Sequence, residues 1–422
     1  MNRSMAAPGV YVTSLPGEKF KRCRVSVHMV LPGSRETATA LAVLPHLLSR
    51  CCEAIPDPLQ FSRRLFRLYG AEVSGDSYQA GGNRVVSLQL SGIKPAYALA
   101  GEDLQAEYIS LLCGLLFAPK REGNAFAAAD FEVEKAKQAD YLKSEMNEKR
   151  SYCLRQARRR LYGDSPQGLE SAGYLDDIEA LTPAFVFECY RSLLQTAQVE
   201  VLVTGLAAES VSAALAAGFA GVPGREPVQP YCADPILPAD METHTEAMDT
   251  VQGKLCILCP SGRLPDEKDA AVLRVATAVL GQLPTSRFFM NVREKQSLCY
   301  YCVCGLGAFS GVLSIDSGVD HGDIAKASKA LLHELQVMQR ELISEEELAQ
   351  AKSALQNSFT TLRDSMGALA GWYLNQQLLG FSADLDEAEK MTAAVTREQI
   401  CEALSAFTPA LEYSLTCKEA AL

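Results

Sequence analysis

The same order of predicted elements occurs twice along this chain. Between residues 21 and 204 the hydrophobic pattern predicts a strand, helices, a pair of strands, further helices and a short last strand. A proline-rich segment without periodicity follows, and the order then restarts and runs to residue 416. A repeated order of elements of this length indicates two similar domains. We predict domains at 1–220 and 246–422, joined by a linker at 221–245.

The pattern inside each copy indicates the fold class. Residues 21–31 alternate between apolar and polar side chains, which predicts a strand with one buried face and His28 on its polar face. Residues 71–90 predict two strands that turn at Gly81-Gly82, and residues 297–316 two strands about Gly305. Strands and helices mix without regular βαβ alternation. This favours an α+β fold in which each domain has a mostly antiparallel sheet with helices packed on one face.

Composition excludes several classes of protein. The net charge of −11 and the lack of a basic face argue against nucleic-acid binding. No segment reaches the ~20 apolar residues that a membrane span requires, and the first residues lack the apolar core of a signal peptide. We therefore predict a cytoplasmic protein with no membrane partner. The 14 cysteines lie scattered in apolar segments and are interpreted as reduced, buried thiols.

Residues 280–304 carry the most specific pattern. A glycine-containing turn precedes Ser286-Arg287-Phe288-Phe289, and Arg293-Glu294 is followed by a short turn and then Leu298 and Tyr300. This pattern resembles the second-domain signature of the M16 peptidase family, which includes insulin-degrading enzyme. Residues 343–352, ISEEELAQAK, resemble the acidic helix start of that family. The resemblance is weak in the first half of the chain and good in the second, and it implies two M16-type domains.

The resemblance gives Arg293 and Tyr300 a role in substrate binding. In the family, an arginine and a tyrosine at these places hold the peptide near the scissile bond. A guanidinium binds carbonyl or carboxylate oxygens with a fork of donors, and a phenol can donate to a tetrahedral oxyanion. From spacing alone, an exposed arginine at a helix end and a tyrosine in a strand would be the simpler interpretation.

The zinc motif of the family is degenerate in this chain. Active members carry His-x-x-Glu-His on the first long helix of the first domain. Here His46 stands at the first histidine, Ser49 at the catalytic glutamate and Arg50 at the second histidine, while the third ligand would fall near Asp140 or Tyr141. An arginine cannot bind a cation, and a serine is not a base at neutral pH. We therefore predict no catalytic residue, no bound metal and no cofactor.

The resemblance implies a non-catalytic, substrate-binding subunit of a heterodimeric zinc metallopeptidase that acts on peptides. Its partner would carry the intact motif, and this chain would contribute to activity only in the complex. The chain looks closest to zinc-less bacterial members linked to peptide maturation and to modification of elongation factor P. Two alternatives stay open: a homodimeric, catalytically dead peptide-binding scaffold, or a hydrolase that uses Cys51 or Cys299 as nucleophile.

Overall fold

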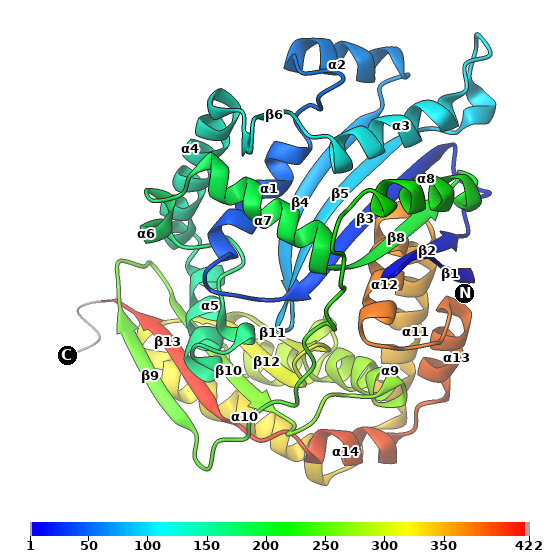
Figure 1. Ribbon diagram of the computed structural model, residues 1–422. Helices are drawn as coiled ribbons and strands as arrows, with labels where there is room; N and C mark the ends of the chain where they lie inside the picture. Colours follow the sequence, from blue (N-terminus) through cyan, green and yellow to red (C-terminus); the bar gives the residue numbers. More distant parts are fainter. Residues whose placement is uncertain (1, 418–422) are drawn as a thin grey trace. The chain divides into compact units, whose positions relative to one another are not determined.

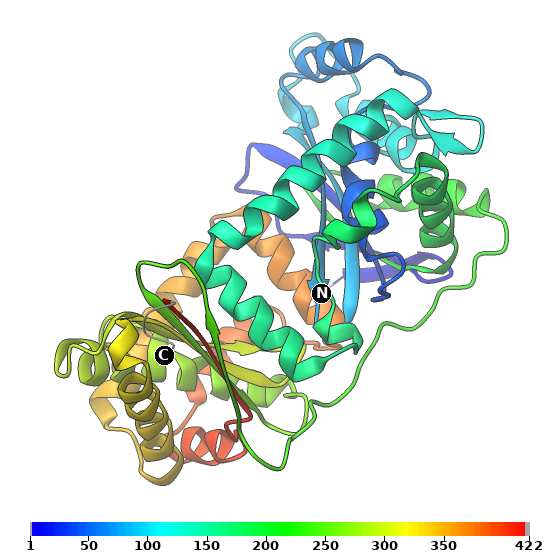
Figure 2. The same cartoon turned by 90° about the vertical axis from the view of Figure 1, so that its left-hand side faces the viewer.

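A computed structural model describes residues 2–417, which group into two compact units. The first unit contains residues 2–144, 169–231 and 366–375, and the second contains 145–168, 232–365 and 376–417. Each unit therefore takes segments from both halves of the chain. Residues 222–241 contain neither helix nor strand, as the extended chain in Figure 2 shows.

The first unit is built on a six-stranded sheet with the order β1-β2-β8-β3-β5-β4 (Figure 1). Neighbouring strands are antiparallel except for β2 and β8, which run parallel. The β4–β5 hairpin turns at the predicted residues 81–82. The strands are β1 (Asn2–Ala7), β2 (Val10–Leu15), β3 (Arg22–Pro32), β4 (Glu72–Ala80), β5 (Asn83–Ile93) and β8 (Gln198–Thr204).

The second unit repeats this topology in a five-stranded sheet with the order β11-β12-β10-β13-β9. Its single parallel pair, β13 and β9, corresponds to the parallel pair of the first sheet and is visible in Figure 2. The predicted fold class, two mostly antiparallel sheets with packed helices, is confirmed. The strands are β9 (Glu242–Ala247), β10 (Gly253–Pro260), β11 (Cys299–Gly307), β12 (Val312–Val319) and β13 (Leu411–Thr416).

Helices supply the other half of each core. In the first unit, the side chains of β3 pack against α1, α3 and α7 in one apolar cluster that includes Val27, Leu44 and Leu112. A two-stranded ribbon, β6 (Arg121–Glu122) and β7 (Ala125–Phe126), precedes α4. The helices of the first half are α1 (Ala38–Leu48), α2 (Pro58–Arg67), α3 (Leu104–Phe117), α4 (Ala128–Ser144), α5 (Lys149–Tyr162), α6 (Leu175–Ile178), α7 (Pro183–Thr196) and α8 (Ala208–Ala220).

The second half carries six more α-helices, and none of the helices within residues 2–417 is both long and apolar enough to cross a bilayer. Two π-helical turns, η4 (Ala278–Gln282) and η5 (Phe288–Glu294), follow α9. The α-helices are α9 (Glu267–Thr277), α10 (Ile324–Arg340), α11 (Glu345–Arg363), α12 (Met366–Leu378), α13 (Leu385–Ala394) and α14 (Arg397–Ser405).

Both faces of β3 are buried along most of its length, so the prediction that strand 21–31 has a solvent-facing side is wrong. His28 is only 5% exposed, and its burial, together with the charge of Arg24, lowers the pKa of the imidazole to about 3. In the second unit the additional cover is α5, whose Cys153 packs with residues of β10 and β13. The polar residues that alternate along β3 therefore face a second layer of protein and not water.

A close approach between β4 and α1 fixes the position of the degenerate zinc helix. A Cβ added to Gly75 would lie 2.2 Å from the carbonyl oxygen of Pro45 in α1. Gly75→Ala should therefore lower the free energy of unfolding by about 1–3 kcal/mol, because backbone must shift to admit the methyl group. Urea denaturation measures the change. Gly371→Ala in α12 is the matched control, since nothing lies within 4 Å of its added Cβ; equal losses in the two variants would contradict this account.

Candidate functional site

The positions of the degenerate zinc motif lie at the C-terminal end of α1. His46 is exposed in the last turn, Ser49 is the residue that ends the helix, and Arg50 follows it. The Ser49 hydroxyl donates to the carbonyl oxygen of His46 at 3.3 Å. The imidazole of His46 has no hydrogen-bond or ion-pair partner among residues 2–417. Among the residues that the structure describes, the long-range polar contacts of these three positions come from Arg50.

The Arg50 guanidinium binds two carboxylates of α4. Its Nε lies 2.7 Å from Asp130 Oδ1, and its Nη1 lies 2.9 Å from Glu134 Oε1. Lys120 Nζ takes the other oxygen of Asp130 at 2.6 Å, and Lys137 Nζ lies 3.0 Å from Glu134 Oε1. The carboxylates are nearly buried, with side-chain exposures of 12% and 8%. Their negative charge is thus neutralised inside the protein by basic side chains.

Asp140 and Tyr141, the residues predicted near the third-ligand position, are both exposed, and that assignment stays a prediction. The carboxylates that contact the end of α1 lie earlier on α4. Asp130 and Glu134 face it instead, because residues four apart share one side of a helix. The available signal was their spacing within residues 128–144, the segment already identified as the matching helix.

This cluster is arranged for charge neutralisation and not for coordination of a metal. Both oxygens of Asp130 already accept hydrogen bonds from cations, and hydrogen bonding to Asp130 raises the pKa of Lys120, which therefore stays protonated. A divalent ion would have to displace the guanidinium. Within residues 2–417, no three histidine, cysteine, aspartate or glutamate side chains are placed to hold a metal ion.

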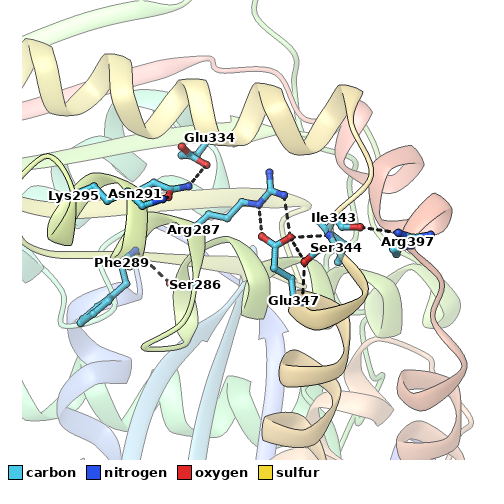
Figure 3. A network of polar contacts seen from close by, with 10 residues as sticks. All are labelled: Ser286, Arg287, Phe289, Asn291, Lys295, Glu334, Ile343, Ser344, Glu347 and Arg397. Carbon is cyan, nitrogen blue, oxygen red and sulfur yellow. Dashed lines mark hydrogen bonds and ion pairs between the residues drawn. The ribbon is translucent and has the colours of Figure 1, made fainter.

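The two segments that resemble the M16 family in the second half are joined by Arg287 and Glu347. Arg287 Nε lies 2.7 Å from Glu347 Oε1 and Nη2 lies 3.2 Å from Oε2, a two-point ion pair (Figure 3). Glu347 also accepts from the backbone and side chain of Ser344, which caps α11 in return. The arginine of SRFF thus anchors the helix start of ISEEE, which explains why both patterns occur in one chain.

The Arg287–Glu347 pair predicts an acid-sensitive contribution to stability. Burial raises the pKa of Glu347, but hydrogen bonds from Arg287 and Ser344 outweigh it, so the net pKa lies below its ordinary 4.5. A carboxyl with a lowered folded-state pKa stabilises the protein above its unfolded pKa, and this stability is lost as pH falls through the folded pKa. Glu347→Gln should therefore flatten the acid limb of stability against pH, measured by urea denaturation between pH 3 and 7.

An isosteric exposed variant distinguishes this effect from a general loss of charge. Glu346→Gln, the neighbouring change on α11, removes the same charge without a contact to Arg287. It should leave the acid limb unchanged. Parallel profiles for Glu346→Gln and Glu347→Gln would contradict the assignment.

Arg293 lies on the second π-helical turn with its guanidinium largely free. The side chain is 40% exposed, its Nε is 3.9 Å from Glu294 Oε1, and its guanidinium carbon lies 4.6 Å from the Phe289 ring centroid. π-Helical turns are rare and often lie at functional sites. Here the turn is held by the fully buried Phe288 and Val292, while Arg293 keeps donors available for a ligand.

Tyr300 projects from a bulge at the start of β11. Cys299 pairs with Val319 and Tyr301 pairs with Gly318, so Tyr300 is the additional residue between two ladder positions. Its side chain is exposed, and its hydroxyl donates to Asp320 Oδ1 at 2.7 Å. That hydrogen bond raises the pKa of the phenol, which keeps it a donor at neutral pH. Bulges commonly re-aim a side chain next to a functional site.

Neither cysteine named as an alternative nucleophile has an activating base. Cys51 is buried, and burial raises the pKa of its thiol. The pKa of Cys299 is lowered, chiefly by a hydrogen bond from Cys302. In the part of the chain that the structure describes, no histidine contacts either thiol. The positive charge of Arg293 contributes to the lowered pKa of Cys299, but a hydrolase nucleophile also requires a base to take its proton.

Comparison with known proteins points to one family. Residues 180–355 match the family described as the peptidase M16 inactive domain. A solved structure titled as a peptidase M16 inactive domain from Pseudomonas fluorescens superimposes with a TM-score of 0.81 at 18% identity, over 99% of this chain and 98% of that one. A conserved protein from Enterococcus faecalis gives 0.88 at 24% identity, over 99% and 98%. At these identities the structures show a shared fold.

Sequence comparison then identifies a particular relative. The chain is 25% identical over 389 residues to the "Probable inactive metalloprotease YmfF" of Bacillus subtilis, which covers 92% of this chain and 91% of that protein. The chain is thus homologous to a protein named as a probable inactive metalloprotease, and its residues 180–355 are similar to the peptidase M16 inactive domain. The resemblance predicted from residues 286–300 and 343–352 is confirmed at that level.

Proposed function

We propose that this chain is a non-catalytic, substrate-binding subunit of a heterodimeric M16-type zinc metallopeptidase that acts on peptides. The observation that carries the proposal is the binding of Arg50 by Asp130 and Glu134. Where active members are expected to hold a metal ion, this chain holds a guanidinium. It therefore lacks both the Lewis acid and the general base that hydrolysis of a peptide by this route requires.

The second half supports the binding role. The Arg287–Glu347 ion pair and the two π-helical turns keep the family signature in an ordered arrangement, although they perform no chemistry themselves. Arg293 retains hydrogen-bond donors at the protein surface, and the exposed Tyr300 hydroxyl would have to turn from Asp320 to donate to a ligand. Donors of this kind suit the carbonyl oxygens of an extended peptide. We propose these two residues as the substrate contacts and the end of α1 as non-catalytic.

The partner in this proposal is a subunit with an intact His-x-x-Glu-His motif, in the cytoplasm. The narrower relation to zinc-less members linked to elongation factor P stays a prediction from resemblance. A homodimeric peptide-binding scaffold is the competing assembly, and the following experiment separates the two.

Reconstitution tests the proposal. The chain is purified alone, with an M16 subunit from the same cell that carries the intact motif, and as a mixture with metal-free partner. We expect peptide hydrolysis only in the mixture with zinc-loaded partner, and one zinc per heterodimer by elemental analysis. Stoichiometric zinc and hydrolysis in the isolated chain would refute the non-catalytic role. A stable homodimer that binds peptide but never associates with the partner would refute the heterodimer.

A further inference from the structure

A cavity of about 350 Å³ lies in the first unit, between α7 and the C-terminal ends of α3 and α8. Its apolar wall includes Phe117, Phe187, Tyr190, Leu194 and Val222. Phe187, Tyr190 and Leu194 are each less than 7% exposed, so the core holds this wall in place. Ligand pockets commonly have about 300–1,000 Å³, and this cavity has the size for one aromatic side chain with its polar end.

The helix ends around the cavity offer few free acceptors. The Tyr190 hydroxyl donates to the carbonyl oxygen of Leu116 at 2.8 Å, and Gln195 Nε2 donates to that of Pro223 at 2.9 Å. The backbone N–H of Val222 donates to the carbonyl oxygen of Phe219 at 3.0 Å. Since these carbonyl groups are already paired, the cavity is a poor site for a cationic or donor-rich ligand.

The free polar groups of the wall are donors. Glu53 is bound by Arg121 through Nε at 2.6 Å, which cancels its charge. Arg191 also lines the cavity, is exposed, and has no hydrogen-bond or ion-pair partner among residues 2–417. The wall therefore carries one uncompensated positive charge beside three aromatic rings. A guanidinium with unused donors matches a carboxylate in two-point geometry.

We propose that this cavity binds a carboxylate attached to an aromatic group, with the ring against Phe117, Phe187 and Tyr190 and the carboxylate on Arg191. Aromatic rings prefer edge-to-face or offset contact with one another, which the tilted Phe187–Tyr190 pair provides. Two sources share this chemistry: a free aryl acid or aromatic amino acid, and the C-terminal residue of a peptide. The site is independent of Arg293 and Tyr300 and goes beyond the proposed function.

A charged and a neutral ligand of the same shape test the proposal. N-acetyl-L-phenylalanine and its C-terminal amide are titrated into the full chain by isothermal calorimetry, with saturation-transfer NMR as a second readout. We expect the acid to bind about three- to fivefold more tightly than the amide, the effect of one exposed charge pair. Equal affinity for acid and amide, or no binding of either, would overturn the proposal.

Variants locate the ligand in the cavity. Arg191→Gln should weaken the acid to the level of the amide, and Val222→Phe should abolish binding of both by filling the space. Arg67→Gln on α2 removes an exposed arginine without lining the cavity and should change nothing. Full affinity in a folded Arg191→Gln variant would overturn the proposal even if Val222→Phe failed to fold, because Arg191 is a surface residue.

A last pair of ligands distinguishes the two sources. A hexapeptide that ends in phenylalanine is compared with the same peptide amidated at its C-terminus and with phenylacetate. Binding of the free-acid peptide supports recognition of peptide C-termini. Binding of phenylacetate alone supports a small aryl acid, and both results support the same cavity chemistry.

Discussion

Arg50→Ala should lower the free energy of unfolding by about 2–4 kcal/mol, because it leaves Asp130 and Glu134 nearly buried without their shared guanidinium. The lower end allows for the 26% exposure of Arg50 and for the lysines that still contact each carboxylate. Urea denaturation at pH 7 measures the loss.

An exposed ion pair in the same unit is the matched control. Arg64 pairs with Glu107 at side-chain exposures of 37% and 42%, and Arg64→Ala should cost no more than about 1 kcal/mol. Adding Asp130→Asn to Arg50→Ala should restore part of the stability, since one of the stranded charges is removed. Two results together would contradict this account: equal losses of stability for Arg50→Ala and Arg64→Ala, and no recovery in the double variant. They would show that Arg50 does not neutralise Asp130 and Glu134 as described.

Tyr300→Phe and Arg293→Ala should each lower kcat/KM of the reconstituted heterodimer by roughly 10²-fold, the usual cost of losing one donor to a developing oxyanion or one charged peptide contact. Both side chains are exposed, so stability of the isolated chain should barely change. In Tyr300→Phe, the loss should fall mainly on kcat, because an oxyanion contact is stronger in the transition state. Initial rates across a range of peptide concentrations separate kcat from KM.

Exposed residues of the same types provide the controls. Tyr97→Phe and Arg67→Ala change exposed side chains outside the family signature and should leave turnover unchanged. Full activity in both Tyr300→Phe and Arg293→Ala would end the role proposed for the pair. The non-catalytic assignment would survive that outcome, because it depends on Arg50 and on the metal content.

Local sequence patterns predicted much of the sheet framework. The strand at Arg22–Pro32 and the hairpin at residues 81–82 follow from alternation and a glycine pair. The β9 strand, ETHTEA, begins inside the predicted linker 221–245, because its polar residues show no apolar alternation. The second hairpin turns at residues 308–311 and not at Gly305, which pairs with Ser314 inside the sheet. A glycine indicates a hairpin turn only where the hydrogen-bonded pairing of the two strands ends.

The site was predictable in part. Residue identity alone excluded Ser49 and Arg50 as base and ligand, and the signature drew attention to residues 286–300. The bulge that isolates Tyr300 depends on how β11 pairs with β12, which no single strand reveals. The contact between Arg287 and Glu347 joins residues 60 apart. The charge on each was visible in the sequence, but their pairing was not.

The sequence by itself determined that one order of elements is repeated, which segments form most of its strands and helices, and that the stretch resembling a zinc motif carries a serine and an arginine. Those properties depend on the secondary-structure preferences of the residues, on the spacing of apolar residues along the chain and on the chemistry of single side chains. Only the tertiary structure decided that Arg50 meets carboxylates 80 and 84 residues away, and that His28 faces protein. Such contacts depend on how whole strands and helices pack, because residues far apart in the sequence meet only where that packing brings them together.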